Sequence, residues 1–309
     1  MAKYLVTGGA GFIGSHLTRE LISQGHSVRI IDNLSTGNRE RLHPDAEFVE
    51  ADICDREKIT PLFQGIDGIF HVAALPRVQV SIENPLETHE ANINGTLNVI
   101  WAAKEAGVKR IVYSASSSAY GDSDVLPLVE TMKPDPISPY ALQKYVGEEY
   151  MKLAAMFWGI ETVSLRYFNV FGPDMASEGA YVTVIAIFNR QKLNNQPLTP
   201  TGDGEQTRDF TFVDDVVRAN MLAMKSEKVG KGEVMNIGNS DNKSVNYIAK
   251  FIGGPVQHID PRVEPKNTLA NTGKAKKLIG WQPEVDFDEG LRSTIKWYEE
   301  NKDKFITHE

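Results

Sequence analysis

Short apolar runs alternate with longer segments of helical periodicity through the first half of the chain. The runs predict buried strands at Tyr4–Val6, Val28–Ile31, Glu47–Glu50, Gly68–Val72, Arg110–Ser114 and Thr162–Arg166. The periodic segments between them predict helices, the clearest at Phe12–Leu21, Glu87–Ala106 and Tyr140–Met156. Because strands and helices alternate, the pattern predicts an α/β fold with a doubly wound parallel sheet. A ligand of such a sheet binds at the carboxyl ends of its strands.

This rhythm breaks after about Asn169, where Gly and Pro interrupt the pattern at Gly172-Pro173, Pro197–Gly204 and Gly253–Pro255. A strand followed by a helix is again predicted at Thr211–Met224. We therefore expect a first domain over residues 1–168, to which the chain returns near residues 211–240. A smaller, irregular domain is expected over residues 169–309, covering the edge of the sheet.

A glycine-rich turn, Val6–Gly14, joins the first predicted strand to the first predicted helix. Gly8 permits a tight turn, Gly11 lets the backbone approach a pyrophosphate, and Gly14 lets the helix pack close to the strand. Asp32 ends the second predicted strand, where a carboxylate would meet the ribose hydroxyls of a dinucleotide. The first domain is thus predicted to be of the Rossmann type, and the acid favours NAD over NADP because it would repel the extra phosphate.

Composition excludes several other classes of function. The net charge of -8 and the lack of a concentrated basic run argue against a nucleic-acid partner. Cys54 is the single cysteine and the seven histidines show no metal-ligand spacing, so we expect no disulfide within the chain and no metal site. No stretch is long and apolar enough to span a membrane, and no signal peptide is evident. A cytoplasmic protein that does not bind membranes is expected.

Tyr140 and Lys144 lie four residues apart at the start of a predicted helix, so both face the same side. A neighbouring ammonium group favours the phenolate, which makes such a tyrosine a usable base. Tyr298 and Lys302 have the same spacing, and a solvated helix face is expected there. The difference is that Tyr140 follows a strand ending in the hydroxyl-rich run Ser114–Ser118. This combination predicts a proton-transfer site.

The motifs together resemble those of an extended short-chain dehydrogenase/reductase, and most closely those of the UDP-hexose 4-epimerases. The matching segments cover nearly the whole chain: Thr7–Gly14, Asp52-Ile53, His71–Ala74, Asn92–Thr96, Tyr113–Gly121, Tyr140–Lys144, Arg166–Asn169, Arg208–Phe210, Asn236–Gly238 and Gly280-Trp281. In that family the base takes the proton of the sugar 4-hydroxyl while C4 gives hydride to NAD. The keto sugar then turns, and the hydride returns to its other face.

The resemblance implies a role for each matching residue. It assigns catalysis to Ser116, Tyr140 and Lys144. It assigns NAD binding to Gly8, Gly11, Phe12, Ile13, Gly14, Asp32, Asn33, Asp52, Ile53, Ala73, Ala74, Leu75, Asn92, Ser114, Tyr140, Lys144, Tyr167 and Phe168. It assigns binding of the UDP-sugar to Ser116, Ser117, Tyr140, Asn169, Val182, Thr199, Arg208, Arg262, Glu264 and Thr268. The arginines would meet the diphosphate, for which a guanidinium is well suited.

The chain departs from the family at several positions. Pro76 stands where a lysine is common beside the cofactor, and Thr201 where an aromatic residue commonly lies near the uracil. The segment Arg262–Glu264 is shorter than its family counterpart, and Asn271 replaces a usual aspartate. Ser117-Ser118 replace the Asp-Glu pair of related 4,6-dehydratases, and neither Ser118 nor Ala119 supplies the carboxylate of the decarboxylases.

These features favour NAD-dependent 4-epimerisation of a UDP-hexose. The alternatives are a UDP-glucuronate 4-epimerase, another nucleotide-sugar oxidoreductase, and an NAD-binding regulator without catalysis. Thr268 aligns with the position that borders the sugar C2 substituent, and it is small. We therefore expect UDP-GlcNAc and UDP-GalNAc to be accepted together with UDP-Glc and UDP-Gal. The resemblance also implies a homodimer formed through the helices at Glu87–Ala106 and Tyr140–Met156.

Overall fold

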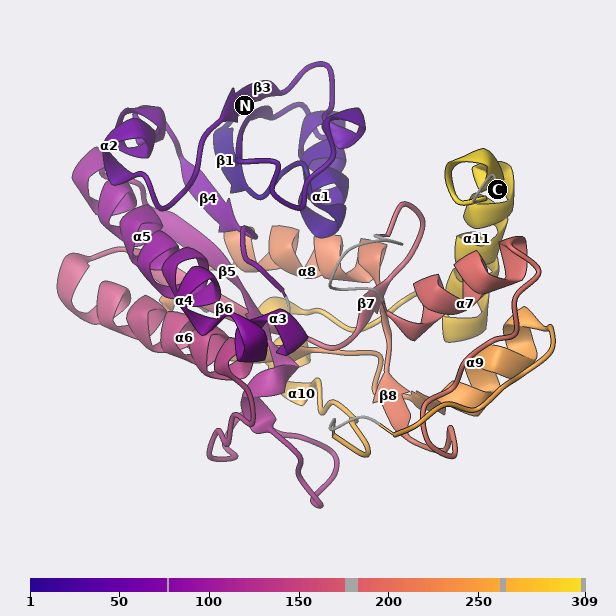
Figure 1. Ribbon diagram of the computed structural model, residues 1–309. Coiled ribbons are helices and arrows are strands. Elements are labelled where there is room, and N and C mark those ends of the chain that lie inside the picture. Colours follow the sequence, from indigo (N-terminus) through magenta and orange to yellow (C-terminus); the bar gives the residue numbers. More distant parts are fainter. Residues whose placement is uncertain (77, 176–182, 262–264, 307–309) are drawn as a thin grey trace.

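A parallel sheet forms the centre of the larger part of the molecule (Figure 1). The computed structural model describes residues 1–76, 78–175, 183–261 and 265–306. The sheet has seven strands in the order β10-β6-β5-β4-β1-β2-β3. The strands are β1 (Lys3–Thr7), β2 (Ser27–Asp32), β3 (Glu47–Glu50), β4 (Gly68–His71), β5 (Arg110–Ser116), β6 (Glu161–Tyr167) and β10 (Lys231–Ile237). This order confirms the predicted doubly wound α/β fold of the Rossmann type.

Burial explains why the strands read as apolar runs. All four residues of β4 are buried, as are six of the seven residues of β5. A parallel sheet covered by helices on both faces has no polar face, so its central strands lack alternation. The predicted bounds agree within two residues, with β4 ending at His71 and β5 continuing to Ser116.

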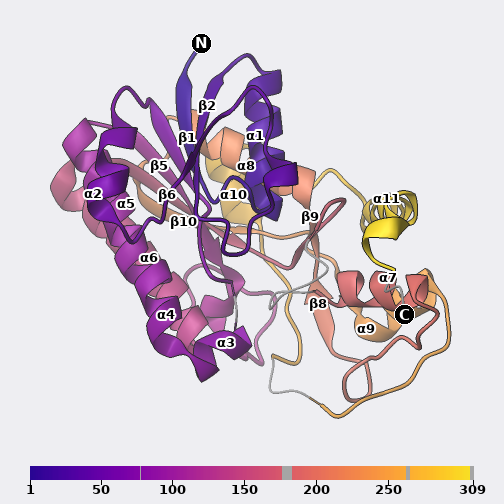
Figure 2. The same cartoon turned by 45° about the horizontal axis from the view of Figure 1, so that its top comes forward.

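Helices cover both faces of the sheet. On one face pack α1 (Phe12–Ser23), α8 (Val213–Lys225) and α10 (Gly273–Ile279). On the other face pack α2 (Arg56–Ile59), α5 (Gly95–Ala106) and α6 (Pro139–Trp158), with α5 and α6 in contact (Figure 2). The chain thus comes back from the smaller part to add α8, β10 and α10 to the larger one.

The helix predicted at Glu87–Ala106 is not a single α-helix. It is divided into α4 (Pro85–His89), a π-helical segment at Glu90–Asn94, and α5. A π-turn holds one residue more than an α-turn, so it rotates the side chains that follow it. Asn92 is buried within this segment, where its side chain reaches two other parts of the chain.

The smaller lobe has its own apolar core beneath α7 (Val184–Leu193), α9 (Val245–Ile252) and α11 (Phe287–Glu300) (Figure 2). It carries two pairs of short strands. These are β7 (Val170–Phe171) with β9 (Thr211–Phe212), in parallel, and β8 (Thr207–Asp209) with β11 (Asn242–Ser244), antiparallel. The remaining short elements are α3 (Val78–Glu83) and 3-10 turns at Arg39–Arg41, Thr60–Phe63, Ser117–Tyr120 and Lys302–Lys304.

The expectation of a solvated face at Tyr298 is wrong. Its side chain is fully buried in the core of the smaller lobe, and burial raises its pKa. Phe305 folds back onto the rings of Trp297 and Tyr298, so the charged end of the chain is anchored at least to this residue. Within the described residues, no helix is long and apolar enough to cross a membrane.

Candidate active site

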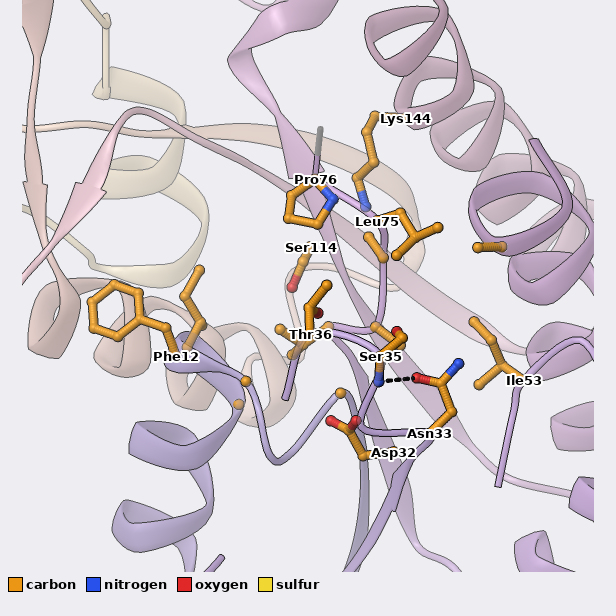
Figure 3. A pocket seen from close by; sticks show the side chains of 18 of the residues that line it. Phe12, Asp32, Asn33, Ser35, Thr36, Ile53, Leu75, Pro76, Ser114 and Lys144 are labelled. Carbon is orange, nitrogen blue, oxygen red and sulfur yellow. Dashed lines mark hydrogen bonds between the residues drawn. The ribbon is translucent and has the colours of Figure 1, made fainter. Parts of the chain in front are cut away.

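A cavity of about 710 Å³ opens at the carboxyl ends of the sheet strands (Figure 3). Its wall combines the glycine turn after β1, the segments that follow β2 and β4, the end of β5 and the first turns of α6. In the sheet order, β1 lies between β2 and β4, where successive connections leave in opposite directions. Ligands of doubly wound sheets bind at this switch point.

The glycine turn is shaped for close backbone approach. Gly8 has a φ of 72°, and a Cβ there would lie 2.7 Å from the Ala73 nitrogen. A Cβ on Gly14 would lie 2.2 Å from the Gly8 carbonyl oxygen, so a side chain at this position would displace the turn. Gly11 caps α1 without a side-chain hydrogen bond, which leaves backbone N–H groups at the helix start for an anion.

Two carboxylates line the same cavity. Asp32 is nearly buried and accepts hydrogen bonds from the backbone nitrogens of Ala10 (3.0 Å) and Leu34 (2.8 Å). Burial raises the pKa of Asp32, although these hydrogen bonds oppose the shift. Asp52 accepts from Asn33 Nδ2 (2.8 Å) and the Cys54 nitrogen (2.8 Å). Burial would raise the pKa of Asp52, but these hydrogen bonds outweigh it and lower the value.

Ser116 ends β5 at the cavity wall and caps the 3-10 turn that follows. Its Oγ accepts hydrogen bonds from the Ser118 backbone nitrogen (3.2 Å) and from Ser118 Oγ (2.8 Å). Because the oxygen accepts two hydrogen bonds, the Ser116 proton is available to a ligand in the cavity. Ser118 was not predicted as a site residue, although it lies within the hydroxyl-rich run.

Tyr140 and Lys144 enter the cavity wall from the start of α6. Ser138 caps this helix by accepting from the Ala141 nitrogen (3.2 Å), and Pro139 occupies its first position. The backbone nitrogen of Tyr140 donates to Ser81 Oγ (3.0 Å) of α3. These contacts fix the position of the first turn of α6, and with it the point at which the Tyr140 phenol enters the cavity.

Lys144 is almost fully buried, and its side chain extends from α6 toward Leu75 and Pro76 (Figure 3). Burial lowers the pKa of Lys144 to about 7, while the carboxylate of Glu148 opposes the shift. The group therefore changes charge near neutrality, in a part of the cavity shared with the Tyr140 phenol.

Most of the residues expected to bind the cofactor line this one cavity. They are Gly8, Gly11, Phe12, Ile13, Gly14, Asp32, Asn33, Asp52, Ile53, Ala73, Ala74, Leu75, Ser114, Tyr140, Lys144 and Tyr167. Tyr167 shares a hydrogen bond of 3.1 Å with Ser114 through its hydroxyl. Pro76, the position that departs from the family pattern, also lines the cavity.

Two expected cofactor residues lie behind the wall. Asn92 accepts from the Leu75 nitrogen (2.8 Å) through Oδ1, and its Nδ2 donates to the Leu75 oxygen (3.1 Å) and to Gln143 Oε1 (2.9 Å). It therefore holds the segment after β4 in place. Phe168 is fully buried in a small cluster with Tyr120 and does not line the cavity.

The expected sugar-nucleotide residues are brought together only in part. Ser116, Tyr140 and Asn169 line the cavity, whereas the remaining described ones, Ser117, Thr199, Arg208 and Thr268, do not. Arg208 Nη1 donates to the carbonyl oxygens of Thr207 (2.9 Å) and Lys266 (3.1 Å). Val182, Arg262 and Glu264 lie outside the described residues.

Thr199 and Thr268 are engaged within the smaller lobe. Thr199 Oγ1 accepts from Gln191 Nε2 (2.7 Å). Thr268 is largely buried and its Oγ1 accepts from the Asp209 nitrogen (3.2 Å). The segment around Thr268 is thus tied to β8, beside Arg208.

Sequence reasoning missed several residues of the cavity wall. Ser35 and Thr36 follow Asp32 closely, and this proximity could have indicated them. Arg41 and Met175 carried no such signal. Arg41 comes from the loop between β2 and β3 and reaches Asp174 of the smaller lobe, with Nε 3.1 Å from Oδ1. Arg41 itself lines the cavity, so this ion pair ties the cavity wall to the smaller lobe.

Comparison with known proteins identifies the family. The model of the family described as "NAD dependent epimerase/dehydratase family" matches residues 4–238 of this chain.

The chain belongs to this family.

Its relatives act on UDP-sugars according to their names. A UDP-glucose 4-epimerase from Thermotoga maritima, solved with UDP-glucose, is 38% identical and superposes with a TM-score of 0.93 over 97% of this chain and 99% of its own. A UDP-N-acetylglucosamine 4-epimerase from Methanobrevibacter ruminantium M1, in complex with UDP-N-acetylmuramic acid, is 35% identical with a TM-score of 0.92 and the same coverages. A UDP-N-acetyl-alpha-D-glucosaminuronate decarboxylase from Bacillus cytotoxicus is 35% identical over 96% of this chain and 98% of its own.

These findings confirm the expected family and its cofactor, NAD. The structure fits that cofactor, since side chains at Gly8 and Gly14 would close the turn and Asp32 stands beside it. Membership of the epimerase/dehydratase family does not specify one sugar or one reaction, because the relatives differ in both.

Proposed function

We propose that the chain catalyses the 4-epimerisation of a UDP-hexose. The observation that carries this proposal is a single cavity wall that contains the glycine turn together with Ser116, Tyr140 and Lys144. The glycine turn and Asp32 would hold NAD, and Ser116 and Tyr140 would hold the sugar in the same cavity. The bound cofactor would supply a hydride acceptor and donor for the sugar C4.

The residues supply the proton transfer and the orientation. Tyr140 takes the proton of the 4-hydroxyl, and the ammonium of Lys144 favours its phenolate form. Ser116 donates a hydrogen bond to the same sugar oxygen, because its own oxygen already accepts two hydrogen bonds from Ser118. Return of the proton from Tyr140 completes the cycle with no net change in the cofactor.

The surroundings of Ser116 favour epimerisation over elimination or decarboxylation. Elimination of water needs an additional acid and base, and the two residues after Ser116 are serines, of which Ser118 is engaged with Ser116 itself. No acidic residue occupies these positions. A reaction that removes and returns a hydride needs no further acid.

The proposed substrates are UDP-GlcNAc and UDP-GalNAc together with UDP-Glc and UDP-Gal. The small side chain of Thr268 supports this range, since a bulky residue at this position would fill the space near the C2 substituent. Arg208 and Arg262 are proposed to meet the diphosphate, and Glu264 the uridine ribose. We further propose a homodimer built on α5 and α6.

A panel of UDP-sugars tests this function. The purified protein, with its bound NAD, is incubated with UDP-Glc, UDP-Gal, their N-acetyl counterparts and UDP-glucuronate, and the products are separated by chromatography. We expect interconversion of C4 epimers without net formation of free NADH. Turnover of UDP-glucuronate alone, release of a keto sugar or CO₂, or absence of turnover with every sugar would each overturn the proposal.

A further inference from the structure

The ammonium group of Lys144 lies over the ring face of Tyr113. Its Nζ is 4.3 Å from the ring centroid. Tyr113 belongs to β5, three residues before Ser116, and it is fully buried and does not line the cavity. The Tyr113 ring therefore does not contact the sugar, and any effect of the ring on the reaction is transmitted through Lys144.

Lys144 forms no ion pair with a carboxylate of the described residues. Glu148, one turn further along α6, is the nearest acid on that helix, but both of its oxygens accept from Arg166, at 2.9 and 2.7 Å. Burial without an ion pair disfavours the charged form of a lysine. The Glu148 carboxylate offsets the effect of burial on Lys144 only in part. The aromatic face of Tyr113 is a second feature that attracts a buried cation, and the attraction is larger when water is excluded.

The Tyr113 ring packs between α6 and His71 of β4. Its hydroxyl points to the Lys144 carbonyl oxygen at 3.5 Å, and the His71 ring lies 5.4 Å away on β4. Gly147 makes room for it, because a Cβ there would lie 2.2 Å from the Tyr113 oxygen. The next turn of α6 thus lacks a side chain where the phenol of Tyr113 reaches the helix.

The titratable groups that face Lys144 are His71, Tyr140 and Glu148. His71 of β4 is fully buried, burial lowers its pKa to about 3, and so it is neutral in the working range. On α6 the titratable neighbours are Tyr140 and Glu148, and the latter is paired with Arg166. The environment of the ammonium therefore consists of a neutral imidazole, a phenol to be ionised, an aromatic face and the carboxylate of Glu148, whose charge is shared with Arg166.

We propose that Tyr113 is a positioning residue whose ring face holds the Lys144 ammonium group charged and within reach of Tyr140. The inference rests on the proposed roles of Tyr140 and Lys144 in the epimerisation. Loss of the ring's negative face would let Lys144 lose its proton or move away. The phenolate of Tyr140 would then be less favoured, and the Tyr140 pKa would rise.

The sharpest test changes the electrostatics of the ring and leaves its shape. Tyr113→Phe is compared with Tyr113→pentafluorophenylalanine, in which fluorine removes the negative ring face. We expect Tyr113→Phe to keep the pH profile of kcat. In the fluorinated variant the acidic limb of kcat should move to higher pH by about one unit, as loss of a buried cation–π contact would give. Variants with fewer fluorines should shift it by smaller, graded amounts.

A second measurement does not depend on turnover. The phenolate absorbance of Tyr140 is obtained at each pH as the difference between proteins with and without Tyr140→Phe, in both the Tyr113 and the fluorinated background. We expect the pKa of Tyr140 to be higher in the fluorinated background. If the wild-type protein turns over no UDP-sugar, the proposed function fails, while this titration still decides the role of Tyr113.

Phe70 provides the matched control. It is fully buried on β4, and no cation lies over its ring among the described residues. Phe70→pentafluorophenylalanine should leave both the pH profile and the Tyr140 titration unchanged. Equal profiles and titrations for Tyr113→Phe and the fully fluorinated variant would overturn the proposal and leave Tyr113 as a packing residue.

Discussion

The three proposed catalytic side chains occupy different settings, and the setting of each determines what it can do. Ser116 accepts two hydrogen bonds from Ser118, which directs its own proton to the cavity. Lys144 is buried on the helix that carries Tyr140, with its charge opposed by burial. Tyr140 stands at the start of α6, where the helix backbone is held by Ser81 and Ser138. In the proposed mechanism the Tyr140 phenol therefore carries the proton, while Ser116 and Lys144 orient the sugar and favour the phenolate.

Tyr140→Phe should lower kcat by about a hundredfold or more, because a positioned acid or base contributes typically 10²–10⁴-fold. Binding of the UDP-sugar, measured by calorimetry, should change little, since the ring remains. Tyr145→Phe on the same helix is the control, because Tyr145 does not line the cavity. Equal, small effects of the two substitutions would exclude Tyr140 as the base.

Thr268→Tyr should abolish turnover of UDP-GlcNAc and spare UDP-Glc, since the larger side chain would exclude the acetamido group. Steady-state kinetics with both substrates measure this discrimination. Thr268→Val controls for the hydrogen bond that Thr268 Oγ1 accepts from the Asp209 nitrogen, and it should retain both activities. Rejection of UDP-GlcNAc by the wild-type protein would refute the proposal that Thr268 borders the C2 substituent of the sugar. Equal loss of turnover of both substrates in Thr268→Tyr would refute it as well.

The elements of the sheet could be predicted from sequence because buried parallel strands and amphipathic helices have distinct periods. The same reasoning missed the π-helical segment at Glu90–Asn94, since one inserted residue hardly alters an apolar pattern. It also missed the burial of Tyr298. Phe305 lies in a charged terminal segment, and the sequence pattern does not indicate that its ring packs against Tyr298. Arg41 and Met175 reach the cavity from loops, whose conformation has no sequence period.

His71 connects three elements through one buried hydrogen-bond chain. The Ala73 nitrogen donates to Thr7 Oγ1 (3.3 Å), and Thr96 Oγ1 donates to the Asn92 oxygen (2.7 Å). The Thr7 hydroxyl then donates to His71 Nδ1 (2.7 Å), and His71 Nε2 donates to Thr96 Oγ1 (3.0 Å). A neutral imidazole satisfies this arrangement, whereas protonation at Nδ1 would place two donors face to face.

The hydrogen-bond arrangement around His71 predicts that the free energy of unfolding decreases in acid. Burial, with the charge of Lys144 adding to it, lowers the pKa of folded His71 to about 3 from the ordinary 6.5. The unfolded chain therefore binds the extra proton between these values, and stability falls as pH decreases from 6.5 toward 3. The slope from this group is about 1.4 kcal/mol per pH unit.

Urea unfolding of the wild type and of His71→Gln at pH 7 and pH 5 measures the effect. The free energy of unfolding of the wild type should fall by about 2 kcal/mol more than that of the variant over this range. The comparison of slopes cancels the other titrating groups. Parallel slopes for the two proteins would show that His71 is not held neutral by the fold.

At the scale of the whole molecule, the outer face of α6 is more apolar than a solvated helix requires. Leu142, Leu153, Met156 and Phe157 expose between 40% and 70% of their surface. Leu142 and Leu153 are three helical turns apart, and Met156 and Phe157 follow one turn later, so they form one stripe. Exposed apolar stripes of this kind mark interaction surfaces. The proposed catalytic residues Tyr140 and Lys144 lie on the same helix, so pairing through this stripe would also stiffen the proposed site.

Leu153→Glu should therefore convert a homodimer into a monomer, because it places a charge within the stripe, one turn before Met156 and Phe157. Light scattering after gel filtration should give about twice the chain mass of 34.3 kDa for the wild type and the single mass for the variant. Val256→Glu is the control, since Val256 is also partly exposed but belongs to the smaller lobe, and it should remain dimeric. A monomeric wild type, or a variant that keeps the double mass, would show that α6 is not the interface.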